Sequence, residues 1–152
     1  MPEKILFYRT QDEYGCFSNF SKHPVDYAGR TWPTSEHAFQ AQKFLEAEHQ
    51  EAIACATSPM IAARLGRDRQ RPLRADWEAV KLDVMRAIVM AKFSQHEELR
   101  QTLLGTVEAE LIEHTARDAF WGDGGDGAGQ NWLGRILMEV REQLRADPSG
   151  AT

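Results

Sequence analysis

The sequence lacks the features of disulfide-rich, metal-binding, secreted or membrane proteins. Its 152 residues include two cysteines, Cys16 and Cys55, whose separation fits no metal-binding pattern and which we expect to be free thiols in a reducing compartment. No apolar run approaches the roughly 20 residues that span a bilayer, and the N-terminus lacks the basic start and apolar core of a signal peptide. We therefore expect a cytoplasmic protein with no membrane segment, zinc or disulfide.

The sequence also lacks an excess of positive charge. Lys and Arg number 18 against 23 Asp and Glu, a net charge of -5, which argues against binding nucleic acid through a broad basic surface. Metal-ligand spacing is missing as well, because the pair Glu36–His37 has no second histidine four positions on. Ser35 and His37 likewise lack the G-x-S-x-G context of a nucleophilic serine. We expect neither a metal site nor a serine nucleophile.

The remaining composition is that of a globular domain. With 42% hydrophobic residues, the chain can form a core of its own, and we expect one domain over residues 1–147 with a frayed tail at 148–152. The predicted fold class is α+β: a mostly helical single domain packed around a small antiparallel sheet. Strands are expected at 4–9, at 25–32 around a turn at Ala28–Gly29, and at 107–114. Helices are expected at 36–46 after Thr34 or Ser35, 48–56, 59–66 after Ser58, 76–93 from Asp76, 96–105 and 132–145 after Asn131.

The stretch RTWPTSEHAFQAQKF, residues 30 to 44, joins a polar stripe to several rings. On a helical wheel Glu36, Gln40 and Lys43 fall within about 60° of one another. The opposite side of the wheel is apolar: Ala38, Ala41 and Leu45. Three rings border the stripe: Trp32, Phe39 and Phe44. The stripe is either a solvated helix face or a partly dry cleft, where a carboxylate can act as acid or base and a lysine as nucleophile.

Two other groups of residues suggest a ligand. Asp118, three positions before Trp121, suits a compound of sugar and base, although a turn-capping aspartate beside a core tryptophan has the same pattern. Five arginines could hold a phosphate through forked hydrogen bonds or could be solvated charges: Arg64, Arg67, Arg69, Arg71 and Arg74. The glycine-rich loop 122–130 could bring backbone N–H groups close to a phosphate, with Asn131 opening a helix whose N-terminus favours anions. It matches no phosphate-binding fingerprint and its two aspartates would repel a phosphate, so a flexible connector fits the loop at least as well.

Six ordered blocks resemble a known family. They are FSNF (17–20), PTSEHAFQAQKF (33–44), DW and VK at 76–81, KF at 92–93, D-x-x-WG (118–122) and N-x-LG-x-x-LM-x-VR (131–141). Together they resemble the NADAR or YbiA-like family from about residue 7 to residue 144. One departure is His96, where the family commonly has Asn.

The resemblance implies a hydrolase of N-glycosyl bonds. The leading expected substrates are ribosylamino-pyrimidine phosphates, early intermediates of the riboflavin pathway. ADP-ribosylated guanine in nucleic acids is the alternative, and a non-catalytic module that binds ADP-ribose or a nucleotide is another. By the same resemblance we expect catalysis by Glu36, Lys43 and Asp118 without a cofactor. The residues expected to bind substrate are Trp77, Trp121, Gly122, Asn131 and Gly134.

The expected chemistry is consistent with these residue types. Breaking a C1′–N bond builds positive charge on the ribose, which a carboxylate such as Glu36 or Asp118 can stabilise, or the carboxylate can activate water. A neutral Lys43 amine could instead form a Schiff base with the opened sugar. Trp77 or Trp121 could stack on the base, worth about 1–3 kcal/mol by analogy with nucleobase stacking on aromatic side chains. The sequence leaves both routes, and the choice of carboxylate, open.

Overall fold

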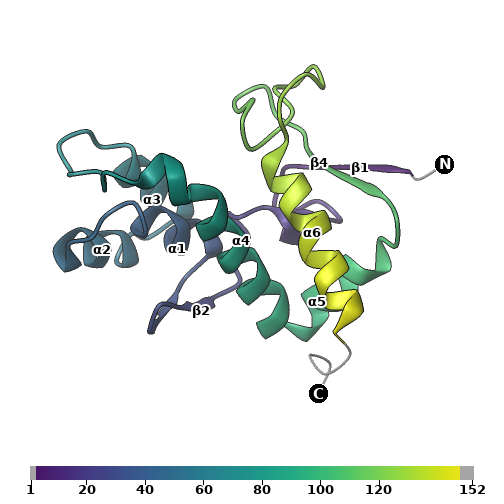
Figure 1. Cartoon of the computed structure of the whole chain (residues 1–152), viewed down its shortest axis with the longest axis horizontal. Helices are drawn as coiled ribbons and strands as arrows, with labels where there is room; N and C mark the ends of the chain where they lie inside the picture. Colours follow the sequence, from purple (N-terminus) through teal and green to yellow (C-terminus); the bar gives the residue numbers. More distant parts are fainter. Residues whose placement is uncertain (1–2, 148–152) are drawn as a thin grey trace. The chain divides into compact units, whose positions relative to one another are not determined.

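The computed structural model describes residues 3–147 (Figure 1). These residues divide into two compact units, which are described separately. Residues 19–92 form the continuous unit, and residues 3–18 with 93–147 form the split unit. The helices and strands confirm the predicted α+β class. The single-domain boundary of 1–147 stays a prediction, and the tail at 148–152 lies outside the described residues.

The continuous unit begins with the predicted hairpin. Strand β2 (Val25–Tyr27) pairs antiparallel with β3 (Arg30–Trp32), so that Val25 lies opposite Trp32. Ala28 and Gly29 at the turn both have positive φ, 52° and 85°. Two consecutive left-handed residues are characteristic of the type I′ turn, whose twist suits a two-residue hairpin.

Helix α1 (Ser35–Ala41) follows the hairpin and is shorter than predicted. Thr34 caps it by accepting a hydrogen bond from the His37 N–H at 3.2 Å. Past Ala41 the chain turns more tightly, and the Lys43 N–H donates to the Gln40 carbonyl three residues back. The predicted continuation to residue 46 was wrong because Arg74 occupies the carbonyl oxygens there. Its backbone N–H donates to the Lys43 carbonyl and its Nη1 donates to the Gln42 carbonyl. Leu45, expected on the buried side of a longer helix, is consequently 67% exposed.

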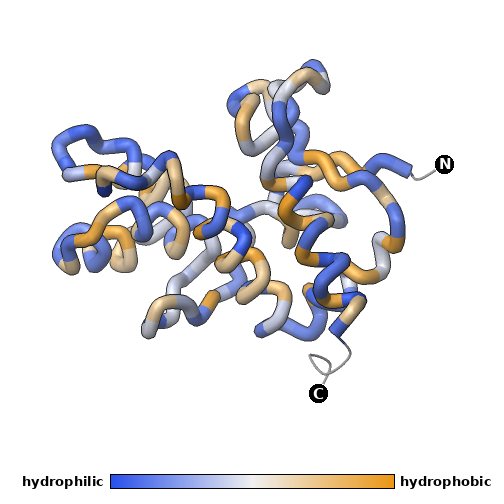
Figure 2. The backbone as a smooth tube through the Cα atoms, viewed as in Figure 1, coloured by the Kyte–Doolittle hydropathy of each residue, from blue (hydrophilic) through white to orange (hydrophobic). Residues whose placement is uncertain are grey.

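Three further helices complete this unit. Helix α2 (Ala47–Ala54) and helix α3 (Pro59–Gly66) both pack against α1. Ser58 caps α3 as predicted, with its Oγ accepting from the Ile61 N–H at 3.2 Å. Helix α4 (Trp77–Gln95) begins here, and its last turn belongs to the split unit. The connection between α3 and α4, which carries the arginines, is hydrophilic throughout most of its length (Figure 2).

The split unit contains a strand pair that the sequence did not predict. Strand β1 (Lys4–Phe7) runs parallel to β4 (Glu110–Glu113), with Ile5 opposite Leu111. Helix α6 (Trp132–Ala146) packs against β4 and against α5 (Glu97–Gly105), and a short 3-10 turn spans Gly15–Phe17. The described part of the chain therefore has one antiparallel and one parallel pair of strands.

Candidate functional site

The polar stripe of α1 is buried, not solvated. Glu36 is 9% exposed and Gln40 is 6% exposed. The Gln40 side-chain amide donates to Glu36 Oε2 at 2.7 Å, and the Glu36 backbone N–H donates to the Asn19 carbonyl at 3.0 Å. A carboxylate removed from water to this extent interacts more strongly with nearby charge than it would in bulk solvent. The interpretation of this stripe as a solvated helix face is therefore wrong for Glu36 and Gln40.

Lys43 lies beside this carboxylate. Its Nζ donates to the Gly66 carbonyl at 3.2 Å, and the side chain is partly buried. Burial lowers the pKa of Lys43 most, the negative charge of Glu36 opposes this, and the positive charges of Arg67 and Lys81 lower it further. A lysine with a lowered pKa has a larger fraction of neutral, nucleophilic amine at a given pH.

Gly66, at the end of α3, is a site residue that the sequence did not predict. A Cβ at this position would overlap Oε1 of Gln40, so only glycine allows α3 to approach the polar stripe so closely. Oε1 of Gln40 is buried and has no hydrogen-bond partner within the part of the chain that the structure describes. Gln40 thus orients the Glu36 carboxylate through one end of its amide, and the other end rests against Gly66.

Trp77 is buried in the core of the continuous unit. It is 5% exposed, and its ring packs on Phe39 with the ring centres 5.1 Å apart and the planes at 57°. Phe39 is a neighbour of the polar stripe on α1, so Trp77 helps to build the apolar wall beside Glu36 and Gln40. Little of its ring is accessible for the predicted stacking on a base.

Asp118, Trp121 and Gly122 lie in the split unit. Asp118 Oδ1 accepts the backbone N–H groups of Phe120 and Trp121 at 2.9 and 2.8 Å, which is the turn-capping alternative considered for this aspartate. The Trp121 ring meets Phe120 edge to face, 4.8 Å between centres. A Cβ on Gly122 would come within 2.9 Å of the carbonyl oxygens of Asp118 and Glu113, so glycine is required by close packing.

Asn131 and Gly134 join α6 to β4. Asn131 is the N-cap residue of α6, as predicted, but it is left-handed, with φ of 53°, and its side chain makes no capping hydrogen bond. Its Oδ1 instead accepts the Glu113 N–H and its Nδ2 donates to the Leu111 carbonyl, both at 2.9 Å. A Cβ on Gly134 would overlap that same carbonyl oxygen. Both residues serve the contact between α6 and β4 through the β4 backbone.

A pair that the sequence did not predict lies close by in the split unit. His114 Nδ1 and Asp123 Oδ2 are 2.8 Å apart, and Asp123 Oδ1 accepts the N–H groups of Thr115 and Gly125. Burial alone would raise the pKa of Asp123, but the hydrogen bonds from His114, Gly125 and Thr115 outweigh it and the pKa is lowered. The carboxylate therefore stays charged and holds the loop together. His114 and Asp123 are nine positions apart in the sequence, and this spacing matches no motif that would predict their contact.

His37 is a structural residue. Its ring nitrogens contact Thr34 Oγ1 at 2.8 Å and the Ala56 carbonyl at 3.0 Å, and burial lowers its pKa. Ser35 Oγ donates to Asn19 Oδ1 at 2.9 Å. Among residues 3–147 no three His, Cys, Asp or Glu side chains gather into a possible metal site. Within the same range no helix is long and apolar enough to cross a bilayer.

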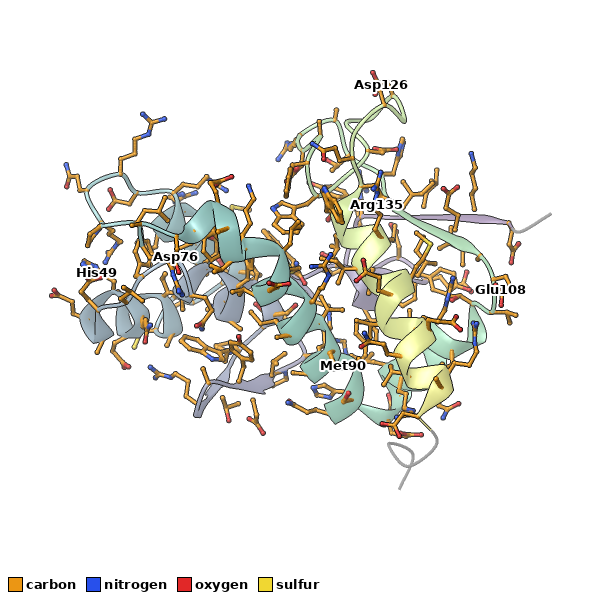
Figure 3. The ribbon with its side chains drawn as sticks, viewed as in Figure 1. His49, Asp76, Met90, Glu108, Asp126 and Arg135 are labelled. Carbon is orange, nitrogen blue, oxygen red and sulfur yellow. The ribbon has the colours of Figure 1, made fainter. Side chains whose placement is uncertain are left out.

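The five arginines do not act as one cluster. Arg74 forms two hydrogen bonds with the Asp76 carboxylate, at 2.6 and 3.0 Å, and Arg71 Nη1 lies 2.8 Å from His49 Nδ1. His49 and Asp76 are labelled in Figure 3. Within residues 3–147 Arg64 reaches only the Met60 sulfur, at 4.0 Å. The side chains of Arg67 and Arg69 are exposed and form no hydrogen bond or ion pair with any other residue of the described chain.

A shallow hollow of about 350 Å³ lies elsewhere in the continuous unit, at residues 26–31 of the hairpin turn. It contains none of the side chains of the polar stripe. The candidate site is therefore defined by the buried carboxylate, the amine and their neighbours rather than by this hollow.

Comparison with known proteins gives consistent results. The family model described as NADAR domain matches residues 6–145. The chain is 60% identical to N-glycosidase YbiA of Escherichia coli over 140 residues, which cover 92% of this chain and 88% of that protein. It is 46% identical to the Riboflavin biosynthesis protein VVA0006 of Vibrio vulnificus, covering 95% of this chain and 40% of that longer protein. The NMR structure of the E. coli protein YbiA superposes with a TM-score of 0.88 at 58% identity, covering 96% of this chain and 88% of that chain.

Proposed function

This chain belongs to the NADAR domain family, and from that premise we propose that it hydrolyses the C1′–N bond of ribosylamino-pyrimidine phosphates, early intermediates of the riboflavin pathway. The class of reaction rests on the relatives: with an N-glycosidase at 60% identity, the chain is a hydrolase acting on N-glycosyl bonds. A relative named as a riboflavin biosynthesis protein supports the choice of substrate.

The observation that carries the proposal is the buried Glu36 carboxylate with the partly buried Lys43 amine within its electrostatic range. As the C1′–N bond breaks, positive charge develops on the ribose ring, and an ionised carboxylate in a sheltered place stabilises that charge more than one in water. Gln40 holds the Glu36 carboxylate in one orientation through its 2.7 Å hydrogen bond, so little reorganisation is needed during the reaction. Glu36 thus has the environment expected of the stabilising or water-activating carboxylate.

Lys43 supplies the covalent alternative. If the ribose ring opens, C1′ becomes electrophilic, and a neutral amine can attack it to form a Schiff base that water later releases. The lowered pKa of Lys43 favours the neutral amine that this step requires. Glu36 remains close enough to interact electrostatically with the amine and could move the protons.

Asp118 stays a predicted third member of the catalytic set. Its Oδ1 is engaged by two backbone N–H groups, whereas Oδ2 has no hydrogen bond to another residue of the described chain. Only Oδ2 is therefore available for the predicted role. The substrate-binding roles of Trp77, Trp121, Gly122, Asn131 and Gly134 also stay predictions, and the contacts of Asn131 and Gly134 support an indirect effect through the backbone of β4.

A mass-spectrometric screen of the purified protein tests this proposal. The wild type is incubated separately with a ribosylamino-pyrimidine phosphate and with ADP-ribosylated guanosine, with and without borohydride. We expect release of the free amino-pyrimidine from the first, and a borohydride-stabilised adduct on Lys43 if the covalent route operates. Lys43→Arg is the control for the adduct, because a guanidinium does not form one. Release of guanosine and ADP-ribose from the second compound alone would instead identify ADP-ribosylated guanine as the substrate.

If neither compound is cleaved, tight binding of ADP-ribose would favour the non-catalytic alternative. Both experiments use the same purified protein, the first measuring cleavage and the second measuring binding. The proposal is therefore separated from its two alternatives by one set of measurements.

A further inference from the structure

Arg67 is an exposed cation next to the buried site, and no side chain among residues 3–147 pairs with it. It directly follows Gly66, whose carbonyl accepts the hydrogen bond from Lys43 Nζ at 3.2 Å. We propose that the Arg67 guanidinium, assisted by Lys81, binds the phosphate on C5′ of the substrate's ribose. This inference rests on the proposed function, because it concerns the same site and specifies how that site selects its substrate.

The backbone of Arg67 is fixed relative to the polar stripe. Its N–H donates to the carbonyls of Ala63 and Arg64, each at 3.2 Å, which ends α3 in a defined turn. Gly66 lies against the Gln40 amide with no room for a Cβ. The hydrogen bond from Lys43 adds a third attachment. The backbone from which the Arg67 side chain extends into solvent is therefore held in a fixed position near Lys43.

The local balance of charge favours an anion. Two cations, Arg67 and Lys81, lie within electrostatic range of Lys43, since both act on its pKa. Glu36 is the buried carboxylate among them, and Glu78, with its side chain 80% exposed, pairs with Lys81 at 2.7 Å. Arg67 has no such partner within the described residues. This small basic patch contrasts with the net charge of -5 of the whole chain.

The chemistry of the candidate substrates identifies the anion. In a ribosylamino-pyrimidine phosphate the reacting ribose carries a phosphate monoester on C5′, and in ADP-ribosylated guanine it carries a diphosphate there. The ribose ring separates C5′ from C1′, so that a buried acid and amine can meet the anomeric carbon while an exposed cation meets the phosphate. A guanidinium is suited to this role because its N–H groups match two phosphate oxygens at once.

The test compares Arg67→Gln with Arg69→Gln. Arg69 is a matched control, because it is also exposed and without a partner in the described chain, but it is absent from the charges that act on Lys43. Each variant is assayed on a ribosylamino-pyrimidine with and without its 5′-phosphate. We expect Arg67→Gln to raise KM at least about tenfold for the phosphorylated substrate only, the loss expected for a charge-assisted hydrogen bond. Arg69→Gln should leave both KM values within about twofold.

Three results would overturn the subsite: equal effects of Arg67→Gln on both substrates, equal effects of the two variants, or no effect of Arg67→Gln. ADP-ribosylated guanosine forms a further arm, and a KM increase on that compound alone would assign the diphosphate as the ligand of Arg67. If the wild type cleaves none of these compounds, the proposed function fails, and calorimetry with ribose 5-phosphate and ribose still decides the subsite. Weaker binding of ribose 5-phosphate by Arg67→Gln then supports it, and unchanged binding rejects it.

Discussion

Residues 36–43 and residues 118–134 both carry polar side chains expected at a functional site, but these side chains are used differently. In the first stretch Glu36 bonds a neighbouring side chain, Gln40, whose own Oε1 has no partner in the described chain, and Lys43 has a lowered pKa. In the second, Asp118 and Asn131 bond backbone groups that would otherwise be unsatisfied. The first arrangement leaves one group with a shifted pKa and another with an unsatisfied acceptor, whereas the second stabilises local structure.

This difference distinguishes residues suited to catalysis from residues that stabilise the fold. A reactive group needs a neighbourhood that changes its pKa or orientation without fully satisfying it. A supporting group has its hydrogen bonds complete, because an unmade bond costs stability. On this basis we expect substitutions in residues 36–43 to reduce the rate at nearly constant stability, and substitutions in residues 118–134 to do the opposite.

The largest expected loss of stability follows from Asn131→Ala. Two hydrogen bonds to the β4 backbone disappear, and alanine is disfavoured at a φ of 53°. We expect the free energy of unfolding, measured in urea, to fall by about 2–4 kcal/mol. Asn131→Gly relieves the backbone strain without restoring the bonds and should recover only part of this loss. A change below about 0.5 kcal/mol would contradict the supporting role of Asn131.

The next largest effect is on the rate, from Lys43→Met and Lys43→Arg. If Lys43 acts as a neutral amine, both variants should lose about 100-fold or more in kcat, since neither provides a nucleophile near neutral pH. The measurement is release of free base under saturating substrate. Retention of the rate by Lys43→Arg would show instead that Lys43 contributes only its positive charge.

Asp118→Asn tests the boundary between the two groups. Asn Oδ1 can accept the same two backbone N–H groups, so the turn and the melting temperature should be preserved. If Oδ2 takes part in the reaction, kcat should still fall by about tenfold, because the charge is lost. An unchanged kcat would show that Asp118 only stabilises the turn and takes no part in the reaction.

The smallest expected effect is the pH dependence of stability caused by Lys43. Its pKa in the folded state lies below the ordinary value of 10.5, so the unfolded state binds more protons between the folded and unfolded pKa. The wild type should therefore gain stability relative to Lys43→Met as the pH rises through that window. Urea unfolding of both proteins at several alkaline pH values measures the gap between their free energies of unfolding. A gap that stays constant would show that Lys43 has an ordinary pKa.

Elements with local signals could be predicted from the sequence. The hairpin turn at Ala28–Gly29 and the start of α3 at Ser58 are set by neighbouring residues, and both predictions were confirmed. The parallel pairing of β1 with β4 joins segments about a hundred residues apart and leaves no local pattern. The end of α1 at Ala41 depends on Arg74, which lies more than thirty residues further along the chain.

The same limit applies to the candidate site. The helical wheel correctly placed Glu36 and Gln40 together, because one helix face is a local property. Lys43 lies beyond the end of α1 but stays within electrostatic range of Glu36. Their burial, the close approach of Gly66 and the position of Arg67 depend on how α3 packs on α1. Tertiary packing of this kind decides which charges are sheltered, and no periodicity in the sequence reports it.

The most direct test of the central claim is the kcat of Glu36→Gln on the ribosylamino-pyrimidine phosphate, measured together with its melting temperature. Glutamine keeps the shape of the side chain and can still accept the hydrogen bond from Gln40, so only the charge is removed. We expect kcat to fall by about 100- to 1,000-fold with little change in melting temperature. Glu48→Gln, on an exposed side chain of α2, is the matched control and should retain the wild-type rate. A folded Glu36→Gln that releases free base at the wild-type rate would contradict the account.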